Sequence, residues 1–195
     1  MKTDIILCGV GGQGILSIAA VIGMAALHEK LHIKQAEVHG MSQRGGAVQS
    51  HLRISDSHIS SDLIPSGSAD IILSVEPLEG LRYLPYLKKD GWLVTAEEPF
   101  ENIPNYPDLD KIMEEISKIP NHLTLGANEL AREAGNLKAS NMVMLGSASP
   151  FIHMKEESLI TGIRDIFNHK GDEVVKLNVN AFRLGRKVNH TIQKN

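Results

Sequence analysis

Apolar residues in this chain fall into short runs of strand length that alternate with longer segments of helical length. The run 4–10 is almost entirely aliphatic and ends at glycines, which predicts a strand buried on both faces. Residues 14–31 are apolar nearly all round and carry charge only near their end, so we expect a buried helix there. A second parallel strand is expected at 32–39, which continues a βαβ unit.

A different pattern follows at 48–55, where apolar or small residues alternate with polar ones. This period of two predicts a strand with one face toward solvent. Residues 55–57 supply turn chemistry, and 58–64 are expected to return antiparallel. We therefore expect a β-hairpin inserted between the elements of a Rossmann-like sheet.

The alternation of strands and helices resumes at residue 69. Strands are expected at 69–75, 92–96 and 123–125, with an irregular proline-containing connection at 99–109. Helices are expected at 79–89 with a bend near Pro85, and then at 111–118, 128–134, 141–147, 156–167 and 172–188. The expected fold class is accordingly α/β, a Rossmann-like three-layer arrangement around a mostly parallel sheet.

Length and composition favour one domain over residues 1–195, because 42% hydrophobic residues can bury one sizeable core. The formal net charge of -3 gives no sign of a nucleic-acid-binding surface. The uncharged stretch 14–27 is too short to span a bilayer, and Asp4 before the first apolar run disfavours a secretory signal peptide. We expect a cytoplasmic protein that binds neither membranes nor nucleic acid.

Cys8 is the single cysteine of the chain. One thiol excludes an intrachain disulfide, a cysteine-rich zinc site and an iron–sulfur cluster held by this chain's own thiolates. Because Cys8 lies inside the first apolar run, we interpret it as a small buried residue in preference to a reactive thiol. The nine histidines are interpreted as surface or strand-face residues, so no metal site is predicted.

The sequence GVGGQG at 9–14 joins the first predicted strand to the first helix. Its spacing matches the dinucleotide-binding fingerprint, in which glycines let the backbone approach a phosphate at a helix N-terminus. Glu37 is the acidic residue at about the right distance to hold a ribose. Gln13 departs from the common pattern because it places an amide at the helix start. Nucleotide binding and a purely structural turn are both open. The glycines of this loop are Gly9, Gly11, Gly12 and Gly14.

A second glycine-rich segment, GMSQRGG at 40–46, follows the second predicted strand. In an open parallel sheet it lies at the same carboxyl edge as the first glycine loop. Arg44 offers a planar guanidinium that suits a carboxylate or a phosphate. The two loops together indicate a polar surface for an anion or for a partner chain. The candidate residues of this segment are Ser42, Gln43, Arg44, Gly45 and Gly46.

Two further residues are candidates for a cleft at this edge. His39 directly precedes the second glycine segment, and Glu76 follows the strand predicted at 69–75. Each also has an ordinary explanation, because His39 can cap or pack and Glu76 can be a solvated carboxylate at a strand end. Asn141 and the small-residue run 145–149 are interpreted as part of a closely packed helix.

Four stretches taken together carry a resemblance that covers nearly the whole chain. They are GVGGQG (9–14), HGMSQRGGAVQSHLR (39–53), ADIILSVEPLEGLRYL (69–84) and NMVMLGSAS (141–149). In this combination the chain resembles the gamma subunit or domain of the 2-oxoacid:ferredoxin oxidoreductases. Within that family it is most similar to the beta subunit of the indolepyruvate enzyme.

The resemblance implies a complex that decarboxylates an aryl 2-oxoacid such as indolepyruvate, transfers the acyl group to coenzyme A and passes electrons to ferredoxin. In this family thiamine diphosphate, its magnesium ion and the iron–sulfur clusters belong to a companion subunit. The sequence also lacks a Gly-Asp-Gly run followed by an Asn that would hold thiamine diphosphate through magnesium. The isolated chain is therefore expected to be inactive and to hold no cofactor alone.

The same resemblance suggests roles for the two loops. The glycines of 9–14 would shape the turn, Gln13 would donate or accept a hydrogen bond at its mouth, and residues 42–44 would form a polar hook. The expected target is the companion subunit, with coenzyme A phosphates or the substrate carboxylate as alternatives. Two other classes of function are also open: a stand-alone NAD(P)- or FAD-dependent oxidoreductase, and a binding module for an anionic metabolite.

Overall fold

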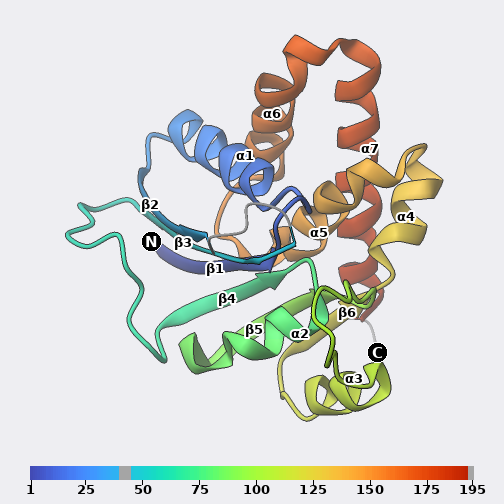
Figure 1. Cartoon of the computed structure of the whole chain (residues 1–195). Helices are drawn as coiled ribbons and strands as arrows, with labels where there is room; N and C mark the ends of the chain where they lie inside the picture. The colour runs from blue at the N-terminus through green and yellow to red at the C-terminus, as the bar shows by residue number, and fades with distance from the viewer. Residues whose placement is uncertain (40–44, 193–195) are drawn as a thin grey trace.

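The computed structural model describes residues 1–39 and 45–192 and contains a six-stranded sheet with helices on both faces (Figure 1). The order of the strands across the sheet is β2-β3-β1-β4-β5-β6. The strands are β1 (Lys2–Val10), β2 (His32–His39), β3 (Ala47–Ser55), β4 (Ala69–Ser74), β5 (Leu87–Ala96) and β6 (His122–Leu125).

Seven α-helices and four short 3-10 helices connect and cover these strands in the described part of the chain. The α-helices are α1 (Ile15–His28), α2 (Pro77–Arg82), α3 (Leu109–Ser117), α4 (Ala127–Ala134), α5 (Ser140–Ala148), α6 (Glu156–Phe167) and α7 (Asp172–Ile192). The 3-10 helices are η1 (Leu84–Tyr86), η2 (Leu137–Ala139), η3 (Ser149–Phe151) and η4 (Asn168–Lys170). None of the helices described is both long and apolar enough to cross a membrane.

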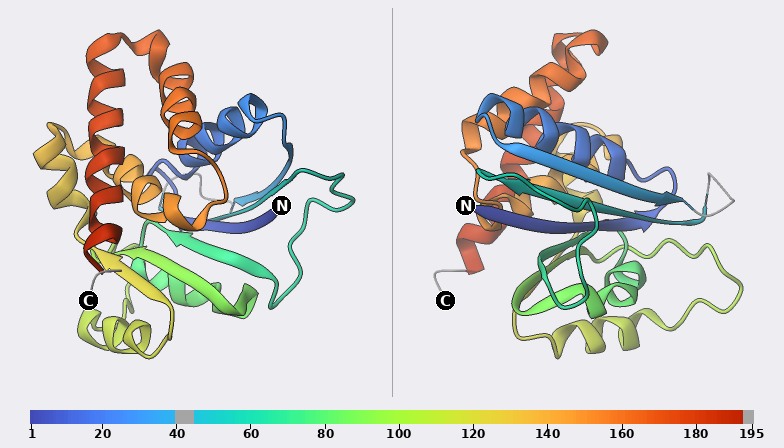
Figure 2. Two further views of the ribbon diagram at one scale, coloured as in Figure 1. Left: turned by 180° about the vertical axis from the view of Figure 1, so that it is seen from behind. Right: turned by 90° about the vertical axis from the view of Figure 1, so that its left-hand side faces the viewer.

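Alternate residues of β1 enter two different cores. Ile5 and Leu7 pack in the larger core with α1, α5, α6 and α7, whereas Ile6 and Cys8 pack in the smaller core with α3. Figure 2 shows α2 and α3 on one side of the sheet and α1, α6 and α7 on the other. The predicted burial of this strand on both faces and of Cys8 within it is confirmed, and burial raises the pKa of the Cys8 thiol.

The inserted hairpin is present, but it consists of β2 and β3. β3 lies between β1 and β2 and runs antiparallel to both, so β1 and β2 share one direction without being neighbours. The prediction of a returning strand at 58–64 is wrong, because these residues form a loop without strand pairing. The remaining pairs, β1 with β4, β4 with β5 and β5 with β6, are parallel.

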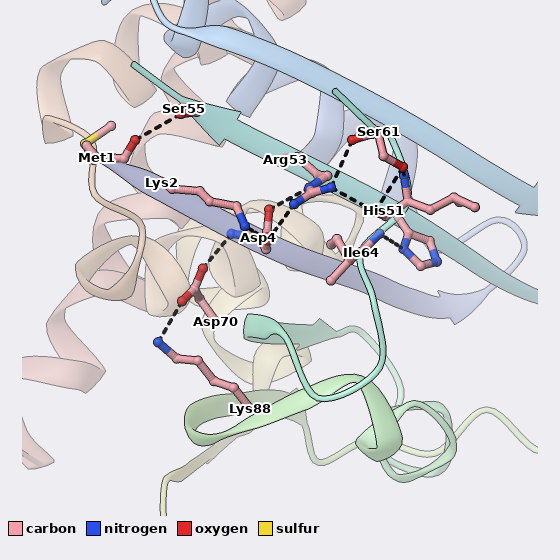
Figure 3. A network of polar contacts seen from close by, with 11 residues as sticks. Met1, Lys2, Asp4, His51, Arg53, Ser55, Ser61, Ile64, Asp70 and Lys88 are labelled. Carbon is pink, nitrogen blue, oxygen red and sulfur yellow. Dashed lines mark hydrogen bonds and ion pairs between the residues drawn. The ribbon is translucent and has the colours of Figure 1, made fainter. Parts of the chain in front are cut away.

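This loop, residues 56–68, also overturns the predicted solvent-facing side of β3. The Arg53 guanidinium pairs with the Asp4 carboxylate at 2.9 and 3.1 Å and donates to the carbonyls of Ser61 and Leu63, each at 2.9 Å (Figure 3). The Ile64 N–H donates to His51 Nδ1 at 3.0 Å. His51 and Arg53 can thus be buried because backbone groups of the loop provide hydrogen-bond partners for them.

The helix predicted at 79–89 is shorter than expected. α2 ends at Arg82, Pro85 lies in η1, and β5 already begins at Leu87. Proline lacks the N–H that a continuing helix needs, which agrees with the end of α2 before Pro85. The other predicted helices and strands appear with boundaries shifted by a few residues.

The small-residue run in α5 packs against α7, as predicted. A Cβ atom added to Gly146 would lie 1.9 Å from the Phe182 carbonyl oxygen, and one added to Gly185 would lie 1.9 Å from the Val143 carbonyl oxygen. The backbones of the two helices therefore approach so closely at this crossing that neither position has room for a side chain.

Candidate functional site

The first glycine loop turns the chain sharply between the end of β1 and the start of α1. Gly12 and Gly14 have φ angles of 104° and 82°, in the left-handed region that favours glycine. A Cβ atom at Gly9 would lie 2.3 Å from Val75 Cγ2, and one at Gly14 would lie 2.4 Å from Asn141 Nδ2. Glycine is thus required here by backbone conformation and by close packing against neighbouring elements.

Gln13 holds this turn together from within. Its Oε1 accepts a hydrogen bond from the Val10 N–H at 2.7 Å, and its Nε2 donates to the Val75 carbonyl oxygen at 3.2 Å. The side chain therefore links the carboxyl ends of β1 and β4. Gln13 thus lies at the mouth of the loop, as the sequence predicted. Both its amide oxygen and its amide nitrogen are hydrogen-bonded to backbone groups.

The end of the second glycine segment lies against the first. The Gly11 N–H donates to the Gly46 carbonyl oxygen at 2.8 Å, and the Gly45 N–H donates to the Gly11 carbonyl oxygen at 3.3 Å. Asn102 Nδ2 donates to the Gly45 carbonyl oxygen at 2.8 Å, which joins the connection after β5 to the same edge. The hook residues Ser42, Gln43 and Arg44 and the side chain of His39 lie outside the described residues.

A cavity of ≈ 750 Å³ opens beside the first glycine loop, at the carboxyl ends of the parallel strands. This volume lies within the range of small-molecule sites, and the position agrees with the ligand-binding edge of open α/β sheets. The wall opposite the loop is formed by residues of α4, η2, α5, η4 and α7. Its polar and charged lining includes Gln13, Ser17, Glu98, Asn128, Asn136, Lys138, Ser140, Asn141, Lys170 and Asn178.

Glu98 caps the N-terminus of α4 in this wall. Its Oε2 accepts from the Ala127 N–H at 3.2 Å and its Oε1 from the Asn128 N–H at 2.6 Å. The carboxylate thus occupies the N-terminus of α4, where backbone N–H groups and the helix dipole favour an anion. Sequence reasoning missed this cap because Glu98 begins an irregular connection that carries no periodic signal.

Asn141 is the most buried polar side chain that faces both the loop and the cavity, with 7% exposed. Its Nδ2 donates to the Gly14 carbonyl oxygen at 3.2 Å. Its Oδ1 is buried and has no hydrogen-bond partner among the residues that the structure describes. The sequence associated Asn141 with helix packing alone, although an amide at the start of an otherwise apolar helix was a usable signal.

Three comparisons relate this architecture to known proteins. The model of the pyruvate ferredoxin/flavodoxin oxidoreductase family matches residues 4–188. The chain belongs to this family. It is 37% identical to an indolepyruvate oxidoreductase subunit, IorB, from Methanothermobacter thermautotrophicus, over 95% of this chain and 96% of that protein.

Solved structures show the same fold at lower identity. The gamma subunit of a keto/oxoacid ferredoxin oxidoreductase from Geobacter sulfurreducens superposes with a TM-score of 0.70 at 23% identity, over 97% of this chain and 99% of that one. A 2-oxoglutarate:ferredoxin oxidoreductase chain from Magnetococcus marinus gives 0.76 at 21% identity, over 97% of this chain and 31% of that one. The α/β fold expected from the sequence is thus confirmed.

In this member of the oxidoreductase family, Glu76 serves the structure. It is 1% exposed, and its Oε2 accepts from the Glu79 N–H at 2.8 Å as the N-cap of α2. Its Oε1 accepts from the Phe100 N–H at 3.3 Å and from the Tyr106 hydroxyl. Glu76 therefore fastens the connection after β5, and it does not line the ≈ 750 Å³ cavity.

Glu79, next to this cap, is buried beside the smaller core. Burial raises the pKa of its carboxyl group, and the Arg82 guanidinium at 3.0 Å opposes that rise. The Glu76 carboxylate thus holds the start of α2 and the connection after β5, and the Glu79 carboxylate pairs with Arg82 within α2.

Proposed function

We propose that this chain is a subunit of a 2-oxoacid:ferredoxin oxidoreductase complex that acts on an aryl 2-oxoacid such as indolepyruvate. The complex decarboxylates the oxoacid oxidatively to an acyl-coenzyme A and passes the electrons to ferredoxin. The observation that carries this proposal is the 37% identity to an indolepyruvate oxidoreductase subunit along almost the full length of both chains. The Magnetococcus marinus relative was solved with coenzyme A bound, which supports coenzyme A as a co-substrate.

The redox and carbanion chemistry belongs to a companion subunit in this proposal. Thiolate-held iron–sulfur clusters usually take four cysteines, and this chain has Cys8 alone, fully buried in β1. Thiamine diphosphate, its magnesium ion and the clusters are therefore assigned to the companion, which reduces ferredoxin in the cytoplasm. The present chain is inactive by itself.

The two glycine segments form the contact surface for that companion. The hydrogen bonds that join Gly11 to Gly45 and Gly46 support this assignment, because they bring both segments to one edge of the sheet. Directly before this junction the sequence contains Ser42, Gln43 and Arg44. In the proposal these three residues form the polar hook. A phosphate of coenzyme A or the substrate carboxylate is the alternative target of the same hook.

Co-expression with the companion subunit tests the proposal. The co-purified complex is expected to reduce methyl viologen when supplied with indolepyruvate and coenzyme A, whereas each subunit alone is not. Arg44→Ala should weaken assembly or raise the apparent KM for coenzyme A or the oxoacid. A complex that turns over equally fast without this chain would contradict the proposal.

The arrangement of the sheet argues against a stand-alone NAD(P) or FAD enzyme. A ribose-binding carboxylate belongs on the strand next to β1, whereas Glu37 lies on β2 and β3 intervenes. Calorimetry with NAD(P)H and FAD provides the check. Saturable binding of either cofactor by the isolated chain would favour that second function.

A further inference from the structure

The helix α1 is apolar on the side that faces away from the protein as well as on the side that faces the core. Leu16 is 50% exposed, Leu27 is 60% exposed, and Ala20 between them is also exposed. The stretch 14–27 contains no charged residue. A surface helix normally carries polar or charged side chains on its outer side, whereas a helix that is apolar all round is normally buried. The outer side of α1 is therefore expected to be covered in the assembled protein.

Other parts of this chain cover α1 on its inner side and on one flank. The inner side packs against β1, β2 and β3, and α6 lies along the flank (Figures 1 and 2). On that flank a Cβ atom added to Gly162 would lie 2.5 Å from the Val21 carbonyl oxygen. Residues three and four apart share one side of a helix, and on the remaining side they form a line that we call the outer face of α1. The outer face of α1 consists of Leu16, Ala20, Gly23 and Leu27.

Gly23 is the residue of this face that packing within the chain does not explain. Glycine inside a helix is less stable than alanine, so it usually marks a close approach of another element. A Cβ atom added to Gly23 would make an ordinary contact, 3.4 Å from Ile33 Cδ1, whereas one added to Gly162 or Gly146 would overlap the backbone of a neighbouring helix. Alanine would therefore fit at position 23 of the single chain, and a backbone that approaches from outside would account for the glycine.

The outer face of α1 is complementary to itself. Its order of leucine, small residue, small residue and leucine, with spacings of four, three and four residues, is the same in both directions along the helix. A two-fold axis between Ala20 and Gly23 brings Leu16 of one copy beside Leu27 of another in an antiparallel pair. Ala20 then lies beside Gly23 of the other copy, where the two helices are closest. A symmetric dimer requires a surface with this property.

The distribution of charge along α1 also suits an antiparallel copy. Its N-cap is Gly14, which has no side chain, and residues 15–18 include no acid. The first turn therefore supplies no side-chain charge that offsets the positive end of the helix dipole. In an antiparallel pair this end lies beside the negative end of the other helix. The four residues of the outer face are uncharged, so two copies meet without repulsion between like charges.

We infer that two copies of this chain associate through the outer face of α1 in an antiparallel, two-fold symmetric contact. The inference goes beyond the proposed function, because it joins two copies of this subunit and thereby two of the proposed complexes. The 14 residues of α1 make a helix about 21 Å long. Such a contact is smaller than the roughly 800 Å² per partner of a standard interface, so we expect a dissociation constant of about 10 µM.

Sedimentation equilibrium of the full chain over about 1–200 µM tests this contact. Leu27→Glu should raise the dissociation constant about a hundredfold, because the two-fold axis buries the new carboxylate twice. Leu63→Glu is the matched control, since Leu63 is 54% exposed in the loop 56–68, away from α1, and should leave the dissociation constant unchanged. Both leucines are largely exposed, so both variants should fold.

Ala20→Leu separates close helix packing from nonspecific adhesion of apolar surfaces. The larger side chain adds apolar area but holds the two helices apart at the centre of the contact. It should therefore weaken association about tenfold. A surface that adheres through its apolar area alone would associate more strongly after this substitution.

Introduced cysteines test the antiparallel order. A mixture of Leu16→Cys and Leu27→Cys chains should form a disulfide between one chain of each kind under mild oxidation, because the two positions lie side by side. Two Leu16→Cys chains should not cross-link with each other, since the antiparallel order separates these positions by about 16.5 Å along the helix. The native Cys8 is fully buried and should not contribute.

The inference is overturned if the unmodified chain stays monomeric at about 200 µM, or if Leu27→Glu and Leu63→Glu associate equally well. It is also overturned if Ala20→Leu strengthens association, or if Leu16→Cys chains cross-link mainly with each other. Loss of co-purification of the companion with Leu27→Glu, without a change in self-association, would assign α1 to the companion and overturn the inference as well. Viologen reduction by the co-expressed complex is measured separately, so failure of the dimer leaves the proposed function standing.

Discussion

The Gly11 N–H donates a 2.8 Å hydrogen bond to the Gly46 carbonyl oxygen, and this bond joins two segments that are separated by a helix and a strand. The loop after β1 and the end of the connection between β2 and β3 are thereby held at one edge of the sheet. This contact depends on β3 lying directly beside β1, with Val10 opposite Ala47. The inserted hairpin is thus the element that brings the second glycine segment to the first.

Replacement of Gly14 should disturb the turn and its contact with α5. Gly14→Ala is expected to lower the free energy of unfolding by about 2–4 kcal/mol, because it combines an unfavourable φ with a Cβ only 2.4 Å from Asn141 Nδ2. Gly12→Ala is the matched control, since its φ is also positive but its Cβ would meet nothing within 4 Å. Urea unfolding of both variants measures the difference, and equal losses would show that packing against Asn141 contributes nothing.

The crossing of α5 and α7 should be even less tolerant. Gly146→Ala is expected to cost about 4 kcal/mol or to prevent folding, because the new methyl would overlap the Phe182 carbonyl. Gly126→Ala should stay within about 0.5 kcal/mol, since its φ of -72° is ordinary and its Cβ would lie 3.7 Å from its nearest neighbour. A stable, well-folded Gly146→Ala protein would contradict the close approach of the two helices.

The ion pair between Asp4 and Arg53 is buried, so removal of one partner should be costly. Arg53→Met is expected to destabilise the protein by about 3–5 kcal/mol, because it leaves Asp4 without its bidentate partner and frees two loop carbonyls. The double variant Asp4→Leu/Arg53→Met should lose less, since it also removes the buried Asp4 carboxylate, which in the single variant keeps the Lys2 ammonium at 2.7 Å as its ion-pair partner. Chemical denaturation measures both, and faster proteolysis within 56–68 should accompany the single variant.

His51 should make the stability of the fold sensitive to mild acid. Burial lowers the pKa of its imidazole, the Arg53 charge lowers it further and Asp62 partly opposes this. The unfolded chain therefore binds a proton on His51 at a higher pH than the folded chain does. The stability that neutral His51 contributes to the fold is fully present above the pKa of the unfolded chain, about 6.5. It is lost as the pH falls toward the lower pKa of the folded chain.

His51→Asn provides the measurement for this effect. The asparagine keeps an acceptor for the Ile64 N–H but does not titrate, so the free energy of unfolding should fall less steeply below pH 6.5. Urea denaturation of both proteins across this pH range gives the two slopes. Identical slopes would mean that protonation of His51 does not couple to folding.

Cys8 should be unreactive as long as the protein is folded. Its side chain is fully buried and burial raises the pKa of the thiol, so little thiolate is available for alkylation. Iodoacetamide is expected to modify Cys8 at a rate set by global unfolding. Rapid labelling of the native protein at neutral pH would contradict this burial.

Local patterns predicted most individual elements because their causes are local. The aliphatic run of β1, the apolar helix α1 and the small residues of α5 each signal their surroundings directly. Pairing partners were harder, since the alternation in β3 does not specify which strands flank it. His51 and Arg53 looked solvent-facing because their partners are backbone groups of a loop with no side-chain signature.

The candidate site followed the same division. The meeting of the two glycine segments was predictable from their positions after successive strands, and the bonds at Gly45 and Gly46 confirm it. The cavity wall could not be predicted from the sequence. Its residues Glu98, Lys138 and Lys170 come from irregular or 3-10 segments that reach this edge through tertiary packing alone.

The close packing of Gly146 against Phe182 and of Gly185 against Val143 also constrains how this chain can vary. A side chain at either position requires the other helix to retreat, and α5 carries Asn141 into the glycine loop at its opposite end. A shift of α5 away from α7 would therefore also displace Asn141 from the glycine loop at 9–14. A chimaera that takes α7 from a homologue but keeps its own segment 140–148 should lose this close packing. The two helices should therefore be exchanged together.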